Sequence, residues 1–225
     1  MIEAAENNGE LTKNKIILEA TSGNTGIGLA LVGAIKGYKV VLTMSAAMSE
    51  ERKTMLKAFG AEIVETDPTK GTDGAIIKAR EIYQENPEKY WMSNQFANKH
   101  NPLVHYHKTA DEVINQVPEI TTFVAGMGTS GTLMGISERL KEHNSEIKIV
   151  GAEPELGHKI QGLKNMKEAI VPEIYKEHKL DHKVVVKTED AYETARQLAI
   201  KEGLFVGMSS GAAMFAALKT AEEMQ

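Results

Sequence analysis

The chain has 225 residues, of which 42% are hydrophobic and 25% charged, with a formal net charge of -5 and no cysteine. This composition is typical of a globular protein with one large or two small domains, and the negative charge argues against nucleic acid or an acidic membrane surface as a partner. Disulfides and thiolate metal sites are excluded, and no apolar run approaches the roughly 20 residues that cross a bilayer. The first residues do not resemble a signal peptide, so we expect a cytoplasmic protein.

Strand-like and helix-like segments alternate along nearly the whole chain. The predicted strands are Ile16–Glu19, Lys39–Met44, Glu62–Glu65, Tyr90–Ser93, Thr121–Ala125, Lys148–Ala152 and Lys183–Lys187. The predicted helices are Thr25–Lys36, Glu50–Phe59, Asp73–Gln84, Leu103–Gln116, Thr132–His143, Asp190–Lys201 and a last one from about Gly211 to the end. This alternation predicts an α/β fold with three α/β/α layers and mostly parallel sheets. A polar stretch after Ser93 indicates two subdomains, residues 1–94 and 95–225.

The most informative segment is Thr21-Ser22-Gly23-Asn24-Thr25-Gly26-Ile27-Gly28, between a predicted strand and a predicted helix. Small hydroxyl and amide residues leave backbone N–H groups free at the start of the helix. Free N–H groups and the helix dipole both favour an anion. The segment therefore predicts a site for a carboxylate or a phosphate.

A second glycine-rich turn, Gly126-Met127-Gly128-Thr129-Ser130-Gly131-Thr132, follows the strand that ends at Ala125. Its glycines let the backbone approach an anion, and its hydroxyls are donors. A plain strand-to-helix turn is the alternative. The glycine spacing disfavours a dinucleotide site, and the lysine of a P-loop is absent.

A third turn, Gly207-Met208-Ser209-Ser210-Gly211, joins an apolar segment to the last helix. A serine N-cap is the alternative interpretation. In an open α/β sheet, ligands bind beyond the carboxyl ends of the strands. We therefore expect the three turns, each placed at a strand end, to line one cleft.

Other polar residues carry weaker signals. His100, His105 and His107 lie close in sequence but lack a carboxylate pattern, so we assign them to solvent or packing and predict no metal site. The charged run from Glu50 to Lys53 is typical of a helix face exposed to solvent.

Taken together, the motifs resemble the cysteine synthases and the related cystathionine β-synthases, enzymes that depend on pyridoxal 5'-phosphate (PLP) and have a fold similar to that of the tryptophan synthase β subunit. The matching stretches occur in family order: Thr21–Gly26, Met48–Arg52, Gly60–Glu62, Asn94–Phe96, Gly128–Thr132, Ala152–Pro154, Ile160–Gly162 and Gly207–Gly211. The family usually has a second glycine where Ser130 stands.

The resemblance implies a role for each matching residue. The PLP fold of type II places two subdomains on either side of a cofactor cleft, and residues 1–94 then form the smaller, mobile, substrate-binding part. Residues 95–225 form the larger part, which binds the cofactor phosphate. The substrate carboxylate is expected to bind Thr21, Ser22, Gly23, Asn24, Thr25 and Gln95, and the cofactor to bind Asn24, Gly128, Thr129, Ser130, Gly131, Thr132, Gly162 and Ser209. Asn24 contacts the ring oxygen of the cofactor and Ser209 its pyridine nitrogen.

The implied reaction is β-replacement, in which O-acetylserine or O-phosphoserine reacts with sulfide to give L-cysteine. Formation of cystathionine from serine and homocysteine is the alternative, since the same motifs serve both reactions. A homodimer is also implied, and the C-terminal peptide of a partner protein is a further candidate ligand of the substrate cleft.

One family feature has no counterpart in the sequence. The Schiff-base lysine of the family lies in an Asn-Pro…Ser-x-Lys-Asp-Arg segment, and Lys13, Lys15, Lys36 and Lys108 do not match it. We therefore expect an internal fragment that is inactive, or nearly so, by itself. A non-catalytic relative that binds a ligand or a partner is the competing hypothesis, and a nucleotide-binding module is a weaker one.

Overall fold

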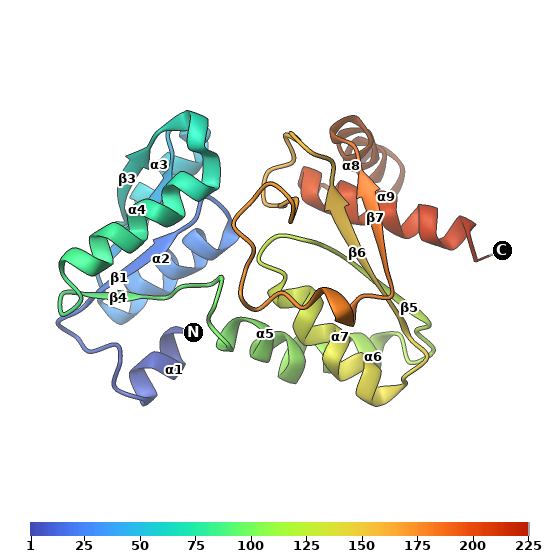
Figure 1. Ribbon diagram of the computed structural model, residues 1–225, viewed down its shortest axis with the longest axis horizontal. Coiled ribbons are helices and arrows are strands. Elements are labelled where there is room, and N and C mark those ends of the chain that lie inside the picture. Colours follow the sequence, from blue (N-terminus) through green and yellow to red (C-terminus); the bar gives the residue numbers. More distant parts are fainter. Residues whose placement is uncertain (225) are drawn as a thin grey trace. The chain divides into compact units, whose positions relative to one another are not determined.

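The computed structural model describes residues 1–224, which form two compact units, Met1–Asn98 and Lys99–Gln225. Each unit is an α/β structure with its own sheet (Figure 1). The two units divide after Asn98, four residues later than the boundary predicted from the sequence, which was after residue 94. The residues in between stay with the first unit because the N–H group of Ser93 donates to the carbonyl of Leu18 at 3.0 Å and that of Gln95 to the carboxyl group of Glu19 at 3.0 Å.

The first unit is built on a parallel sheet with the strand order β3-β2-β1-β4. In β1, Ile17 pairs with Val40 on one side and with Trp91 on the other. Its elements are α1 (Ile2–Asn7), β1 (Ile16–Ala20), α2 (Asn24–Lys36), β2 (Val40–Ser45), α3 (Glu50–Ala58), β3 (Glu62–Thr66), η1 (Pro68–Lys70), α4 (Gly71–Glu85) and β4 (Tyr90–Met92).

Helices cover both faces of this sheet, as the contacts of Val40 and Thr43 in β2 show. Val40 faces α2, where a Cβ atom on Gly33 would lie 2.4 Å from its side chain. Thr43 points to the opposite face, where its hydroxyl donates to the carbonyl of Ala75 in α4 at 2.8 Å. Every residue of β2 is therefore buried, which explains its apolar, β-branched sequence. The only tryptophan of the chain, Trp91, belongs to the same core and is 6% exposed.

The second unit is built on a parallel sheet with the strand order β5-β6-β7. Its elements are α5 (His100–Val104), the π-helical segment η2 (His105–Thr109), α6 (Ala110–Gln116), β5 (Thr122–Gly126), α7 (Gly131–His143), β6 (Lys148–Pro154), η3 (Glu177–Lys179), β7 (His182–Val186), α8 (Thr188–Glu202) and α9 (Met208–Glu222).

Consecutive residues of β6 separate the two apolar layers of this unit. Ile149 belongs to a cluster with Leu133 of α7, whereas Val150 belongs to a cluster with Ala212 of α9. Successive side chains of a strand point to opposite faces, so α7 and α9 cover opposite sides of the sheet. The predicted three-layer α/β/α architecture with parallel strands is confirmed in each unit.

Every predicted strand is present, with ends shifted by one or two residues. The helix predicted over Leu103–Gln116 begins earlier, at His100, and contains the π-helical segment. Pro102 is tolerated in its first turn, because the N–H group that proline lacks has no acceptor there. Helix α1 has no counterpart among the predicted elements. No helix over residues 1–224 has the length and apolar character needed to cross a bilayer.

The expectation that a strand leads into the third turn is wrong. Residues 203–207 are in no strand, and the N–H group of Leu204 bonds back to the carbonyl of Leu198 at 3.1 Å, closing the end of α8. An apolar run with a β-branched residue was insufficient evidence for a strand, because strand formation also requires a neighbouring strand to pair with.

Candidate functional site

The Thr21–Thr25 loop joins β1 to α2 in the first unit, as predicted. Gly23 precedes the helix, and the N–H groups of Gly26 and Ile27 bond back to its carbonyl at 3.0 and 3.4 Å. The N–H groups of Asn24 and Thr25 belong to the first helical turn, where the helix offers no acceptor. The loop therefore presents backbone donors at the positive end of the helix dipole.

Three hydrogen bonds fix the shape of this loop. The N–H group of Thr21 donates to the carbonyl of Thr43 at 3.1 Å, and the hydroxyl of Thr21 accepts from the N–H group of Gly23 at 3.2 Å. Arg52, in α3, donates from Nη1 to the carbonyl of Ser22 at 2.8 Å. The loop is thus held from both β2 and α3.

Gln95 lies beside the start of the same loop. Its side-chain Nε2 donates to the carbonyl of Ala20 at 3.2 Å, and its backbone N–H group donates to the carboxyl group of Glu19 at 3.0 Å. Gln95 is 6% exposed. All the residues predicted to bind the substrate carboxylate are therefore gathered at the carboxyl end of β1.

The second glycine-rich turn connects β5 to α7 in the second unit. Ser130 has a φ angle of 67°, in the left-handed region, and its hydroxyl donates to the carbonyl of Thr129 at 2.5 Å. The N–H group of Met134 bonds to the carbonyl of Ser130 at 2.8 Å. The N–H groups of Gly131 and Thr132 precede that bond and have no acceptor within the helix. This helix end is a second position that favours an anion.

Side chains from the preceding helical segment hold the threonine hydroxyls of this turn. Nδ2 of Asn101 donates to Oγ1 of Thr129 at 3.1 Å, and Nε2 of His105 lies 3.2 Å from Oγ1 of Thr132. Nδ1 of His105 lies 3.0 Å from Oγ1 of Thr109. Burial lowers the pKa of His105, which favours the neutral form of its ring.

Gly162 contacts the same turn, and the residue before it contacts the start of α9, where Ser209 lies. A Cβ atom on Gly128 would lie 2.6 Å from the carbonyl oxygen of Gly162, so the two backbones are in close contact. The N–H group of Gln161 donates to Sδ of Met208 at 3.4 Å, directly before Ser209 in the first turn of α9. The residues predicted to bind the cofactor in the second unit are thus close together.

Comparison with known proteins identifies the family. The sequence pattern described as "Pyridoxal-phosphate dependent enzyme" matches residues 1–225. The chain belongs to this family.

Relatives within the PLP-dependent family agree in sequence and in structure. A cysteine synthase of Aquifex aeolicus is 49% identical over 218 residues, which are 96% of this chain and 67% of that protein. The crystal structure of cysteine synthase from Entamoeba histolytica has a TM-score of 0.90 at 40% identity, covering 98% of this chain and 68% of that one. An O-acetylserine dependent cystathionine beta-synthase from Helicobacter pylori has a TM-score of 0.93 at 34% identity, covering 100% of this chain and 75% of that one.

The turn before α7 fits the phosphate group of PLP, the family's cofactor. A phosphate accepts hydrogen bonds, and here the N–H groups of Gly131 and Thr132 and the hydroxyl of Thr129 are donors at one helix end. Gly128 lacks the side chain that would collide with the neighbouring loop. The geometry and the donor set therefore suit a phosphate held close to the backbone.

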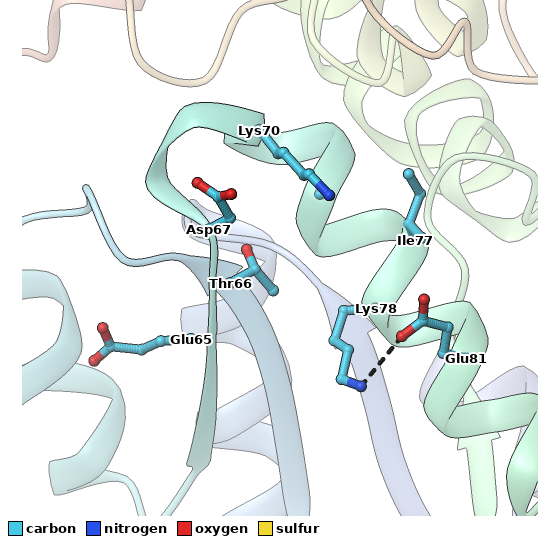
Figure 2. A pocket seen from close by; sticks show the side chains of 8 residues that line it. Glu65, Thr66, Asp67, Lys70, Ile77, Lys78 and Glu81 are labelled. Carbon is cyan, nitrogen blue, oxygen red and sulfur yellow. Dashed lines mark hydrogen bonds and ion pairs between the residues drawn. The ribbon is translucent and has the colours of Figure 1, made fainter.

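A hollow of about 210 Å³ in the first unit lies elsewhere, between the end of β3 and α4. Figure 2 shows its charged lining, in which Nζ of Lys78 pairs with Glu81 at 3.1 Å. The carboxylate of Asp67, also in the lining, accepts from the N–H group of Thr69 at 2.8 Å. None of the predicted site residues lines this hollow. Over residues 1–224, no three His, Asp or Glu side chains come together as metal ligands would.

The residues that support the site are not evident from local sequence patterns. The charged run was predicted to face solvent, which is wrong for Arg52, bound to the loop, and for Lys53, which is 4% exposed. Lys53 donates to Glu50 at 2.9 Å and to Glu65 at 3.1 Å. Glu19 could have been noticed, because it is the one charged residue within the buried strand β1.

Proposed function

We propose that this chain forms the cofactor-binding and amino-acid-binding parts of a cysteine synthase, which exchanges the β-substituent of O-acetyl-L-serine or O-phospho-L-serine for sulfide. The observation that carries the proposal is the contact of Gly128 with Gly162 beside the donor-rich start of α7. The 49% identity to a cysteine synthase supports the choice of reaction.

In this proposal, each unit binds one anionic group. The N–H groups of Asn24 and Thr25, with the side chain of Gln95, bind the carboxylate of the amino acid. The turn from Gly128 to Thr132 binds the cofactor phosphate. When bound, PLP supplies an electron sink that makes the α-proton and the β-leaving group of the amino acid removable.

Ser209 is proposed to donate its hydroxyl to the pyridine nitrogen, with Asn24 at the ring oxygen. A neutral partner stabilises a protonated pyridine less than a carboxylate does, which limits the electron sink to the chemistry of β-elimination and addition. We also propose that the smaller unit moves over the amino acid and excludes water. A homodimer, a cytoplasmic location and a partner peptide that competes with the amino acid complete the proposal.

Cystathionine formation from serine and homocysteine is a second candidate function. The structural likeness to the Helicobacter pylori enzyme, at a TM-score of 0.93, favours cystathionine formation, although that enzyme is named for its dependence on O-acetylserine and not on serine. In both reactions the site binds the cofactor and the carboxylate of the serine-type substrate. The reactions differ in the sulfur nucleophile. The donor groups described above suit either reaction.

The experiment supplies the chain with PLP and measures binding by absorbance, with and without inorganic phosphate. We expect saturable binding that phosphate weakens, and the amides of Thr21–Thr25 to shift in NMR spectra when O-acetyl-L-serine is added. Parallel assays with sulfide and with homocysteine distinguish the two reactions. We expect slow turnover in both, because none of the chain's lysines matches the Schiff-base lysine of the family. Absence of PLP binding contradicts the proposal.

A further inference from the structure

Glu19 lies at the carboxyl end of β1 and is 1% exposed. Three donors surround its carboxyl group: Oε1 accepts from the N–H group of Ala20 at 3.0 Å, and Oε2 accepts from the hydroxyl of Ser93 at 2.5 Å and from the N–H group of Gln95 at 3.0 Å. These partners are uncharged. Burying a carboxyl group without a cation is costly, so such a residue is retained where its hydrogen bonds have a use.

The three donors belong to two chain segments, one on each side of the carboxyl group. Ala20 leads directly into the Thr21–Thr25 loop, whereas Ser93 and Gln95 follow β4. Between the latter two, Asn94 has a φ angle of 45°, in the left-handed region. A backbone in this region persists when hydrogen bonds on both sides hold it, and Glu19 accepts one bond on each side of Asn94, from Ser93 and from Gln95.

We propose that Glu19 is a positioning residue, whose carboxyl group holds Gln95 against the Thr21–Thr25 loop so that both keep one arrangement toward the carboxylate of the amino acid. This inference rests on the proposed function. Glu19 acts through Gln95, because its own oxygens are already bonded and buried. The second bond of Gln95, from Nε2 to the carbonyl of Ala20, orients the side chain along the same strand end.

The substitution Glu19→Gln tests this role at nearly constant volume. An amide offers one oxygen where the carboxyl group offers two, so an N–H group, of either Ala20 or Gln95, loses its acceptor. Glu19→Asp keeps both carboxyl oxygens but withdraws them by one methylene group from Gln95. The control is Glu153→Gln in the second unit, a glutamate that is 3% exposed, accepts from the N–H group of Met166 at 3.0 Å and, unlike Glu19, has a cation, Nζ of Lys183, at 3.5 Å.

The experiment uses the full chain with PLP supplied and follows backbone amides by NMR. L-Serine is the probe, and ethanolamine, which lacks the carboxylate, is the matched negative ligand. We expect Glu19→Gln and Glu19→Asp to weaken L-serine binding about tenfold and to raise hydrogen exchange at Gln95, while Glu153→Gln stays within about twofold of the unsubstituted chain.

The outcomes separate this inference from the proposed function. If the unsubstituted chain binds L-serine and either Glu19 variant folds and binds it within about twofold, the positioning role is wrong and the proposed function stands. If the unsubstituted chain responds equally to L-serine and ethanolamine, carboxylate recognition fails and both are overturned. If Glu19→Gln unfolds, Glu19→Asp decides, since it retains the carboxyl group.

Discussion

Gly128 and Gly162 approach so closely that a Cβ atom on Gly128 would lie 2.6 Å from the carbonyl oxygen of Gly162. Real Cβ atoms do not come this near to backbone oxygen, so Gly128→Ala forces one of the two loops to move. We expect this variant to bind PLP at least about tenfold more weakly, as measured by an absorbance titration.

Gly28→Ala is the matched control for the loss of a glycine. Gly28 lies on the exposed face of α2 with no atom within 4 Å of an added Cβ. Alanine favours helix, so we expect stability to change by no more than about 1 kcal/mol and PLP binding to be retained. Equal PLP affinity in Gly128→Ala and in the control would show that the close contact has no bearing on the cofactor.

Ser130 offers a second test of the turn, because it holds a φ angle of 67° while 3% exposed. A β-branched residue adopts this region poorly, so Ser130→Val should lower the free energy of unfolding by about 1–3 kcal/mol. Glycine adopts it freely, and Ser130→Gly should remain within about 1 kcal/mol. Denaturant unfolding of the two variants measures the difference, and a more stable valine variant contradicts the left-handed backbone.

The buried carboxyl group of Glu19 predicts a pH dependence of stability. Burial raises its pKa to about 7 from the ordinary 4.5, since its hydrogen bonds do not fully offset the lost hydration. Between those two values the unfolded chain releases the proton while the folded chain keeps it. The contribution of Glu19 to stability is therefore complete at low pH and lost as the pH rises to about 7, by about 3 kcal/mol.

Glu19→Gln removes this titration, so the difference in free energy of unfolding between the two proteins isolates it. We expect the difference to change steadily from about pH 4.5 to about pH 7 and to be flat above. Carboxylates such as Asp181, whose pKa its hydrogen bonds lower, act in the opposite direction but cancel in the comparison. A flat difference across the whole range would mean that Glu19 titrates as an ordinary carboxyl group.

The lysines of the chain predict the result of chemical trapping. No lysine of the chain lies in a Ser-x-Lys-Asp-Arg segment like that of the family. Two lysines are also ion-paired: Nζ of Lys36 lies 2.6 Å from Glu6, and Nζ of Lys53 bonds two glutamates. After PLP is bound and borohydride added, we expect mass spectrometry to find no lysine modified in stoichiometric amount. A single fully modified lysine contradicts the expectation and identifies a catalytic amine.

The sequence predicts the elements well where a local pattern decides them. The strand β2 is apolar and β-branched because two helical layers cover it, and the three glycine-rich turns stand out because glycine and hydroxyl residues follow apolar runs. Family motifs then indicate the residues of the two helix ends that we propose bind anions. Each of these features is contained in a short stretch of sequence.

Long-range partners were beyond prediction from local patterns. The bond from Arg52 to Ser22 and that from Asn101 to Thr129 join residues about thirty positions apart. The sequence around either residue contains no pattern that indicates its partner. The same holds for Leu204, whose apolar neighbours resemble a strand although no strand pairs with them. Such contacts depend on how the helices and strands pack, which local patterns in a single sequence do not specify.

The position of Trp91 gives the chain a built-in reporter. As the sole indole, buried beside β1, it fluoresces from the first unit alone, whereas circular dichroism sums the helices of both. Divergence of the two signals during denaturation would therefore reveal two independent cooperative blocks, and coincidence would reveal one.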